Sequence, residues 1–489
     1  MLIRLAAAAA ILVFAGACTT PEPIAQRELV ERSEMVKRAT RPADLPLERP
    51  LAFPDAVVRG LAQNLDIRLA ALEAVIARGA VDLADLGKLP QLVRSAGYFE
   101  RTPAGAATDK DPTDPERRTN NTELSWNVLD FGVAYVRAQQ AANDALAAEE
   151  RRRRMANAIV NELRFTYWTA ALGARRLPEI AAIAKEIEAA MQRSKKLVEA
   201  RLQDPVVALA YQDGLLELQR QTRSYETEVA QARARLARLL NAHPSTPIRL
   251  VAAPPDEAFR ALGAIERQTL EDVALVTRPE VRESEYAARN RQLDVINAYV
   301  QGLPSFRLRV TEFYDSTTAL ADDRWRETGW NFSWNVLGVL STVQRASLAR
   351  QGTALVEVRR LALALGVMEQ VGISREQLAL YDDDYALAKE AARVRRGIYE
   401  IRRDRVPFGE MDELERIRAA VSAVLAQIRE DKAYAALQRA YGDLLASIGV
   451  DQFPEGLDLS SPDAPQAIER HLAALPGTVR DLAAQIAAL

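Results

Sequence analysis

Two copies of a short stretch, Ser125-Trp126-Asn127-Val128-Leu129 and Ser333-Trp334-Asn335-Val336-Leu337, each close a run of alternating side chains. Before the second copy, Trp330 and Phe332 alternate with Asn and Ser residues, and the first run shows the same order around Trp126. Successive side chains of a strand point to opposite sides, so both runs predict strands with one aromatic and one polar face. A soluble β-sandwich would show the same alternation. The long Ala-rich helical segments around these strands, with no further sheet to cover them, argue against a sandwich.

The chain repeats on either side of these two anchors. Each strand pair is preceded by a Leu-Pro step and, further upstream, by an acidic-aliphatic-Arg step, and each is followed by long helical sequence. The matching segments are Leu89-Pro90 and Leu303-Pro304, Asp66-Ile67-Arg68 and Glu280-Val281-Arg282, and Leu239-Leu240-Asn241 and Leu444-Leu445-Ala446. A repeat of roughly 200 residues is too long for a solenoid unit. The sequence therefore predicts a duplicated half-domain: helix, strand, loop, strand, long helix, turn, long helix.

This plan divides the chain into five parts. We expect a signal peptide at 1–17, an extended arm at 18–50, a first repeat at 51–263 with strands at about 91–101 and 122–130, a second repeat at 264–449 with strands at about 305–314 and 329–337, and a tail at 450–489 that ends in a modest helix. The tail lies outside the duplicated plan, so its truncation should matter less than substitution of Trp126 or Trp334 by Asp. Gly173 and Pro178 predict a kink or junction in the first long helix.

Composition excludes several classes of function. Lys and Arg total 64 against 67 for Asp and Glu, so the charge balance gives no sign of nucleic-acid binding. With one Cys and two His far apart in sequence, a zinc site, a disulfide framework and Cys–His catalysis are all excluded. No Ser, His and Asp group or other catalytic arrangement is evident, so we predict neither an enzyme nor a cofactor.

The N-terminus carries a targeting segment. Arg4 is followed by an apolar run from Leu5 to Phe14, and Ala15-Gly16-Ala17 precede Cys18. This resembles a bacterial lipoprotein signal, with Ala15 where Leu is usual. The resemblance implies that Cys18 is acylated (for example with palmitate) after cleavage, and the absence of Asp after it implies sorting to the outer membrane. The alternative is an ordinary secretory signal in which the Cys has no role.

Two groups of arginines stand out. Arg307 and Arg309 alternate with apolar residues in the third strand, an arrangement that suits a water-filled lumen on the polar face. The run from Arg151 to Arg154 lies within the first long helix, and we interpret it as a solvated helix face.

Four strands cannot close a barrel, and lipid does not tolerate an open strand edge, so strands that cross a membrane would require oligomerisation. In its duplicated plan, its Leu-Pro steps, its Asn64-Leu65-Asp66 segment and its Ser-Trp-Asn-Val-Leu strand ends, the chain resembles the outer-membrane efflux protein family, the TolC-like exit ducts. The resemblance covers essentially the whole mature chain.

The resemblance implies a mostly α-helical protein with membrane β-structure. In such a homotrimer the strands form one 12-stranded β-barrel, and the helices form a long periplasmic tunnel. It further implies a passive conduit of a tripartite efflux or type I secretion-like system, docked to a periplasmic adaptor (membrane fusion) protein and an inner-membrane pump. The expected location is the outer membrane of a Gram-negative bacterium, with a lipid anchor. The cargo cannot be predicted from these features.

The family's tunnel entrance lies at the two helical turns. Charged residues there could gate the entrance or dock the partners, or could simply be solvated turn charges. The candidates are Asp204, Arg402, Arg403, Asp404, Arg405, Glu410, Asp412 and Glu413. At the other end, the residues expected to face lipid are Trp126, Trp330, Phe332 and Trp334.

Two other functions compete with this one. A lipid-anchored periplasmic coiled-coil scaffold or adaptor without a pore would also be rich in helices, but adaptors carry a single helical hairpin and this chain has two. An envelope hydrolase would need a catalytic group, and the sequence offers none.

Overall fold

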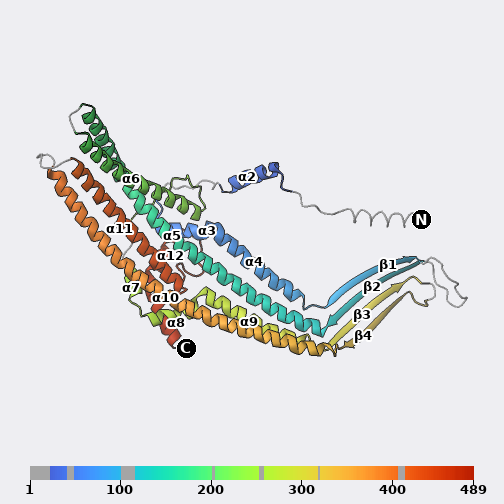
Figure 1. Cartoon of the computed structure of the whole chain (residues 1–489). Helices are drawn as coiled ribbons and strands as arrows, with labels where there is room; N and C mark the ends of the chain where they lie inside the picture. Colours follow the sequence, from blue (N-terminus) through green and yellow to red (C-terminus); the bar gives the residue numbers. More distant parts are fainter. Residues whose placement is uncertain are drawn as a thin grey trace.

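The computed structural model describes residues 23–40, 49–100, 116–200, 204–252, 258–317, 320–405 and 413–488. The molecule is elongated, with a small sheet at one end and two helical hairpin tips at the other (Figure 1). Its helices are α2 (Gln26–Thr40), α3 (Phe53–Gln63), α4 (Leu65–Leu86), α5 (Val128–Glu199), α6 (Pro205–Leu239), α7 (Ala258–Gly263), α8 (Arg267–Thr277), α9 (Pro279–Val300), α10 (Gly338–Arg405), α11 (Glu413–Ser447) and α12 (Ala464–Ala487). The expected mostly helical class is confirmed.

The strands are β1 (Gln91–Glu100), β2 (Glu116–Asn127), β3 (Ser305–Asp315) and β4 (Arg324–Ser333), and they form one antiparallel sheet in the order of the chain. The halves of the chain meet where β2 pairs with β3, with Leu124 opposite Val310. Each half therefore contributes one helix (α4 or α9), two strands, and a long helical hairpin (α5–α6 or α10–α11).

The strands end earlier than the sequence suggested. β2 ends at Asn127 rather than near 130, and β4 ends at Ser333 rather than at 337. The Asn residue of each five-residue copy explains why the strands end early. The Asn127 side chain caps the N-terminus of α5, so Val128 is already helical, and Asn335 makes a similar bond just before α10. The repeated stretch is a strand-to-helix junction rather than the middle of a strand.

The first long helix is not interrupted at Pro178. Proline removes one helical hydrogen bond and crowds the preceding turn, yet α5 runs through it for 72 residues, which is about 108 Å of rise. Leu172 and Ile180, on either side of Pro178, are both buried against neighbouring helices. Packing on both sides outweighs the local cost of the proline.

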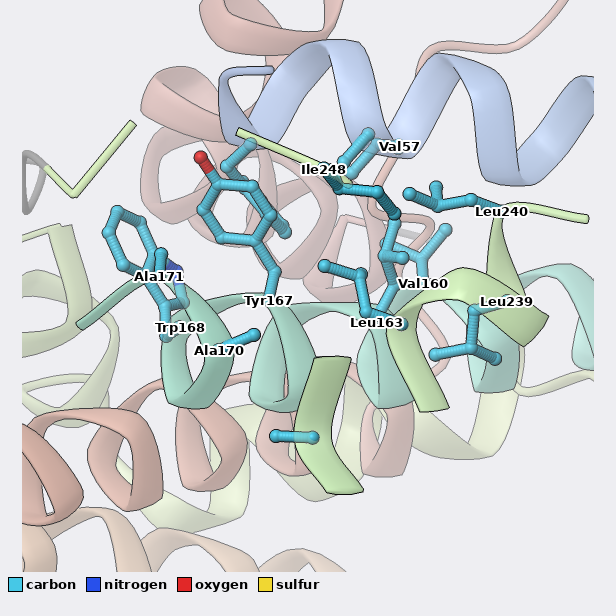
Figure 2. Packing of buried hydrophobic residues seen from close by; sticks show 14 of the residues in the cluster. Val57, Val160, Leu163, Tyr167, Trp168, Ala170, Ala171, Leu239, Leu240 and Ile248 are labelled. Atoms are coloured by element: carbon cyan, nitrogen blue, oxygen red, sulfur yellow. The ribbon is translucent and has the colours of Figure 1, made fainter. Parts of the chain in front are cut away.

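Two hydrophobic clusters fill the middle of the molecule. One surrounds Tyr167 and Trp168 of α5, which pack edge to face with ring centroids 5.2 Å apart. Figure 2 shows this cluster, with Leu239, Leu240 and Ile248 closing over α5. The Tyr167 hydroxyl lies 2.8 Å from the carbonyl oxygens of Leu51 and Val251. The second cluster joins α8, α10, α11 and α12.

The C-terminal tail belongs to this core. Ile468 in α12 is buried in the first cluster, and Leu475 and Val479 are buried in the second. This packing argues against the expectation that truncation of the tail matters less, because α12 supplies apolar side chains to both clusters. The segment 18–50 also differs from the predicted extended arm, since α2 forms within it.

The arginine run of α5 is only partly a solvated face. Arg151 and Arg154 both contact Glu283 on the surface, at 2.6 and 3.4 Å. Arg153 instead is half-buried, binds the Asp451 carboxylate at 2.7 Å, and donates to the carbonyls of Thr277 and Gly449. This side chain ties the first half of the chain to the second, so the sequence interpretation was wrong at this position.

Candidate functional site

One face of the sheet carries a continuous apolar band next to the helices. Residues directly opposite each other in an antiparallel pair project to the same side of the sheet. The strand register therefore places eight apolar side chains on one face: Leu92, Leu124, Trp126, Phe306, Leu308, Val310, Trp330 and Phe332. All except Val310 are exposed in this chain, and the rings of Phe306 and Trp330 stack with centroids 5.8 Å apart. An exposed apolar band of this kind marks a surface that is covered by lipid or by another protein.

Three of the four residues expected to face lipid share this band, and the fourth does not. Trp126, Trp330 and Phe332 lie within strands on the apolar face. Trp334 lies beyond the end of β4, and its indole N–H donates to the Gly302 carbonyl at 3.3 Å. It stands at the junction with the helices rather than on the strand face.

The opposite face is polar in its helix-proximal half. It carries Ser125, Arg307, Arg309 and Asn331 next to the helices and Glu123, Thr311 and Glu327 further along the strands, beyond which the rings of Phe313 and Trp325 stack on the same face. Thr311 is buried, whereas the apolar face is almost entirely open. A sheet with one apolar and one polar face fits an arrangement with lipid on one side and water on the other.

The sheet has two free edges within the described chain. β1 pairs only with β2, and β4 pairs only with β3, so each presents a row of backbone groups without strand partners. The helices next to the sheet continue the same order: α4 packs on α5, α5 on α9, and α9 on α10 (Figure 1). One side of the chain is thus formed by β1 and α4, and the other by β4 and α10.

The helices at the two sides of the chain, α4 and α10, each carry apolar residues on two opposite faces. Ile67, Ala70 and Ala74 of α4 are buried, while the other side of the helix is exposed, with Ile76 at 73%. The exposed row of α4 consists of Leu65, Leu69, Leu72, Ile76 and Leu83. Its spacing of three, four and seven residues is that of a coiled-coil seam.

The α10 helix repeats this arrangement at the other edge. Its buried side includes Val371 and Leu378. Opposite them, an exposed row recurs every seven residues: Ile373, Leu380, Leu387, Val394 and Ile401. Leu380 is 64% exposed. The sequence contained this signal, but only the structure shows that these positions are not used within the chain.

The far ends of the hairpins carry the charged candidates. Asp204 caps α6, its carboxylate accepting from the Val206 N–H at 2.8 Å and the Val207 N–H at 3.3 Å. Arg402 binds Glu415 across the second hairpin at 3.1 Å, and Arg403 binds the adjacent Asp404 at 3.0 Å. These local contacts give each of the named side chains a role in the turn itself.

Five of the predicted residues have no described side-chain contact of this kind. Cys18, Glu410 and Asp412 lie outside the described residues. Arg405 ends α10 and Glu413 begins α11, which puts both at the second tip. Within the described part of the chain, no cluster of His, Cys, Asp and Glu side chains could hold a metal ion. None of the described helices is both long enough and apolar enough to cross a bilayer.

The structure is similar to solved outer-membrane channels. It superposes on the CmeC outer membrane channel of Campylobacter jejuni with a TM-score of 0.70, at 14% identity, over 86% of this chain and 89% of CmeC. It superposes on the outer-membrane channel OprN with a TM-score of 0.65, at 18% identity, over 82% and 91% of the two chains. The chain has the fold of the TolC-like outer-membrane efflux proteins.

One relative found by sequence also carries the name of an outer-membrane protein. The chain is 27% identical over 286 residues to a Salmonella typhimurium protein named "Probable outer membrane lipoprotein SilC". The match spans 56% of this chain and 57% of that relative. No protein-family profile matches the sequence.

Proposed function

We propose that this protein is the outer-membrane channel of a tripartite export system, a passive conduit in which no chemical reaction takes place. In this proposal it resides in the outer membrane of a Gram-negative bacterium, is anchored there through acylated Cys18, and extends into the periplasm through its helical hairpins. The lipoprotein signal, the TolC-like fold and the two-faced sheet support this proposal together.

The observation that carries the proposal is the pair of complementary edges. A strand edge and an exposed apolar seam occur together on both sides of the chain, on β1 with α4 and on β4 with α10. Edges of this kind are incompatible with lipid unless they are paired. Since the two edges differ, copies associate head to tail, and such an association forms a ring when the rotation closes.

Three copies would give the 12-stranded barrel that the resemblance implies. Each junction would pair β1 of one copy with β4 of the next and would set the seam of α4 beside the sheet-proximal part of α10. Exposed apolar residues of that part of α10 are Leu348, Leu355, Val358, Leu361 and Leu365. Burial of one Leu or Ile side chain contributes about 1.5–3 kcal/mol, so two rows of five would provide a strong interface. The apolar band of the sheet would then face lipid, and the polar face would line the pore.

The hairpin tips would form the entrance to this pore, where a periplasmic adaptor and an inner-membrane pump dock. Arg402, Arg403, Asp404, Arg405 and Glu413 lie at the second tip, and Asp204 lies at the first. In the proposed ring, each of these charges appears three times around the opening, where it could influence passage or docking.

The test is the native mass of the full-length protein extracted with detergent from an outer-membrane fraction, followed by conductance of the same sample in a planar bilayer. A mass of three chains with discrete conductance steps is the expected result. A monomer without conductance would overturn the channel and favour a lipid-anchored periplasmic scaffold. A Cys18→Ala variant, followed by mass spectrometry of the N-terminal peptide, tests the acylation separately.

A further inference from the structure

We propose that Arg307 and Arg309 make the helix-proximal part of the barrel lumen a selectivity zone for anions, such as chloride and solutes that carry carboxylate or phosphate groups. This inference rests on the proposed channel and concerns the polarity of its pore. It arises from the distribution of charge along the polar face of the sheet.

The strand register fixes the side on which these arginines lie. Arg307 is paired with Asn331, and Arg309 is paired with Gly329. Both therefore project away from the apolar band, whose residues Leu308 and Trp330 form the rung between them. Both arginines are exposed, and a side chain added at Gly329 would meet no other atom within 4 Å. The guanidinium groups thus stand over open space on the polar face.

Charge on this face is segregated along the strands. In the three rungs nearest the helices, the remaining residues are Ser305, Ser333, Asn127, Asn331, Gln91, Ser125 and Gly329. Arg307 and Arg309 are the only charged residues of these rungs, and neither is held in an ion pair by the described residues. The next rung carries Glu123 and Glu327, on either side of Thr311.

Other charges near the base of the sheet largely cancel. A small pocket at the strand–helix junction is lined by Lys88, Asp130 and Arg307, among others. Lys88 binds Asp85 at 2.7 Å, so these two charges offset each other, and Asp130 offsets one of the arginines. The net charge at this level of the sheet is therefore one positive charge per chain.

In a ring of three copies Arg307 and Arg309 would place six guanidinium groups on one band of the pore wall, followed by six carboxylates further out. Rings of like charge set the selectivity of pores, with Arg and Lys favouring anions. Neighbouring rungs on one face are about 7 Å apart, close to the screening length of about 8 Å at physiological salt, so the carboxylates only partly cancel the arginine band. Arginine also donates to carboxylate and phosphate in a two-point geometry that lysine lacks.

The experiment measures the reversal potential of the reconstituted full-length protein in a gradient of potassium chloride around physiological ionic strength. In the double variant Arg307→Gln/Arg309→Gln, the reversal potential should move away from the equilibrium potential of chloride and toward that of potassium. The matched control is Arg324→Gln/Arg326→Gln, which removes the same charge from the opposite face of the same sheet. It should leave the reversal potential unchanged.

Two further variants separate charge from structure. Arg307→Lys/Arg309→Lys keeps the charge and should keep the wild-type reversal potential, whereas Glu123→Gln/Glu327→Gln should shift it further toward chloride. Conducting trimers whose reversal potential is the same in the Gln double variant and the wild type would overturn this inference and leave the channel intact. Absence of any conductance in the wild-type protein would instead overturn the proposed function.

Discussion

Asn127 and Asn335 make equivalent hydrogen bonds in the two halves of the chain. The Asn127 side-chain oxygen accepts from the Leu129 N–H at 3.1 Å, and that of Asn335 accepts from the Gly338 N–H at 2.8 Å. Each bond satisfies a backbone donor at the point where a strand gives way to a helix of about 70 residues. The repeated Ser-Trp-Asn-Val-Leu stretch thus marks the place where the chain changes from the sheet to the hairpins.

Replacement of either Asn should therefore loosen the junction. Asn127→Ala and Asn335→Ala should each reduce stability by about 1 kcal/mol, because a capping side chain contributes about that much. Thermal unfolding of the assembled protein in detergent measures the change. Asn331→Ala, in the middle of β4, serves as the control and should have little effect, and an equal loss in all three variants would contradict the capping role.

A lysine in the exposed seam of α4 should prevent assembly without unfolding the chain. Ile76→Lys places a charge in a surface that the proposed ring buries, at a cost of several kcal/mol for an unpaired buried charge. Native mass spectrometry should show monomers with unchanged helical circular dichroism. Asp82→Lys introduces the same side chain on the same helix, off the seam, and should still assemble.

Arg153 should matter far more than its neighbour Arg154. Arg153→Ala leaves two carbonyls without their donor and the Asp451 carboxylate with only the Asn157 amide, which should cost about 3 kcal/mol. Arg154→Ala removes only an exposed contact to Glu283 and should cost less than about 1 kcal/mol. Similar unfolding midpoints for the two variants would contradict the bridging role of Arg153.

The C-terminal helix should be required for folding. Leu475→Ala and Val479→Ala each create a cavity at a fully buried position, and the Leu substitution should cost about 2–5 kcal/mol. Gln485→Ala, on the exposed side of α12, should be neutral. Protease sensitivity of the folded protein distinguishes the variants, and normal resistance after deletion of residues 464–489 would show that α12 is dispensable.

Glu430 should make stability depend on pH. Burial, reinforced by the neighbouring Asp431 charge, raises the pKa of Glu430 above its usual value. Because the folded state holds the proton more tightly than the unfolded state, this contribution is fully present below the unfolded pKa. It is lost as the pH rises through the folded pKa. Glu430→Gln should abolish the effect and raise the thermal midpoint at pH 7 but not at pH 4.

The sequence was informative where a pattern is local. The alternation around Trp330 and the duplicated Leu-Pro steps were sufficient to predict two strand pairs and a mostly helical class. It failed where distant segments decide the outcome. α5 continues through Pro178, where side chains of α6 and α11 pack against it, and Arg153 is half-buried because Asp451, about 300 residues away, lies beside it.

The same contrast between local patterns and distant contacts applies to the candidate site. Periodicity alone predicted the aromatic face of the sheet. Trp334 fits that periodicity but lies beyond the end of β4, where its indole N–H donates to the Gly302 carbonyl. The seam of α10 is visible in the sequence as apolar residues at intervals of seven. That spacing does not reveal whether the chain itself or another copy covers the seam.

The unlike edges of this chain have a genetic consequence. In a head-to-tail ring every subunit uses each of its edges once, so a single subunit with one damaged edge is enough to keep the ring open. When such a variant is produced beside the intact protein in equal amounts, only the rings free of the variant close. A mutation in the α4 seam should therefore act as a dominant inhibitor in a cell that still carries a normal copy, whereas a mutation that prevents folding should be recessive.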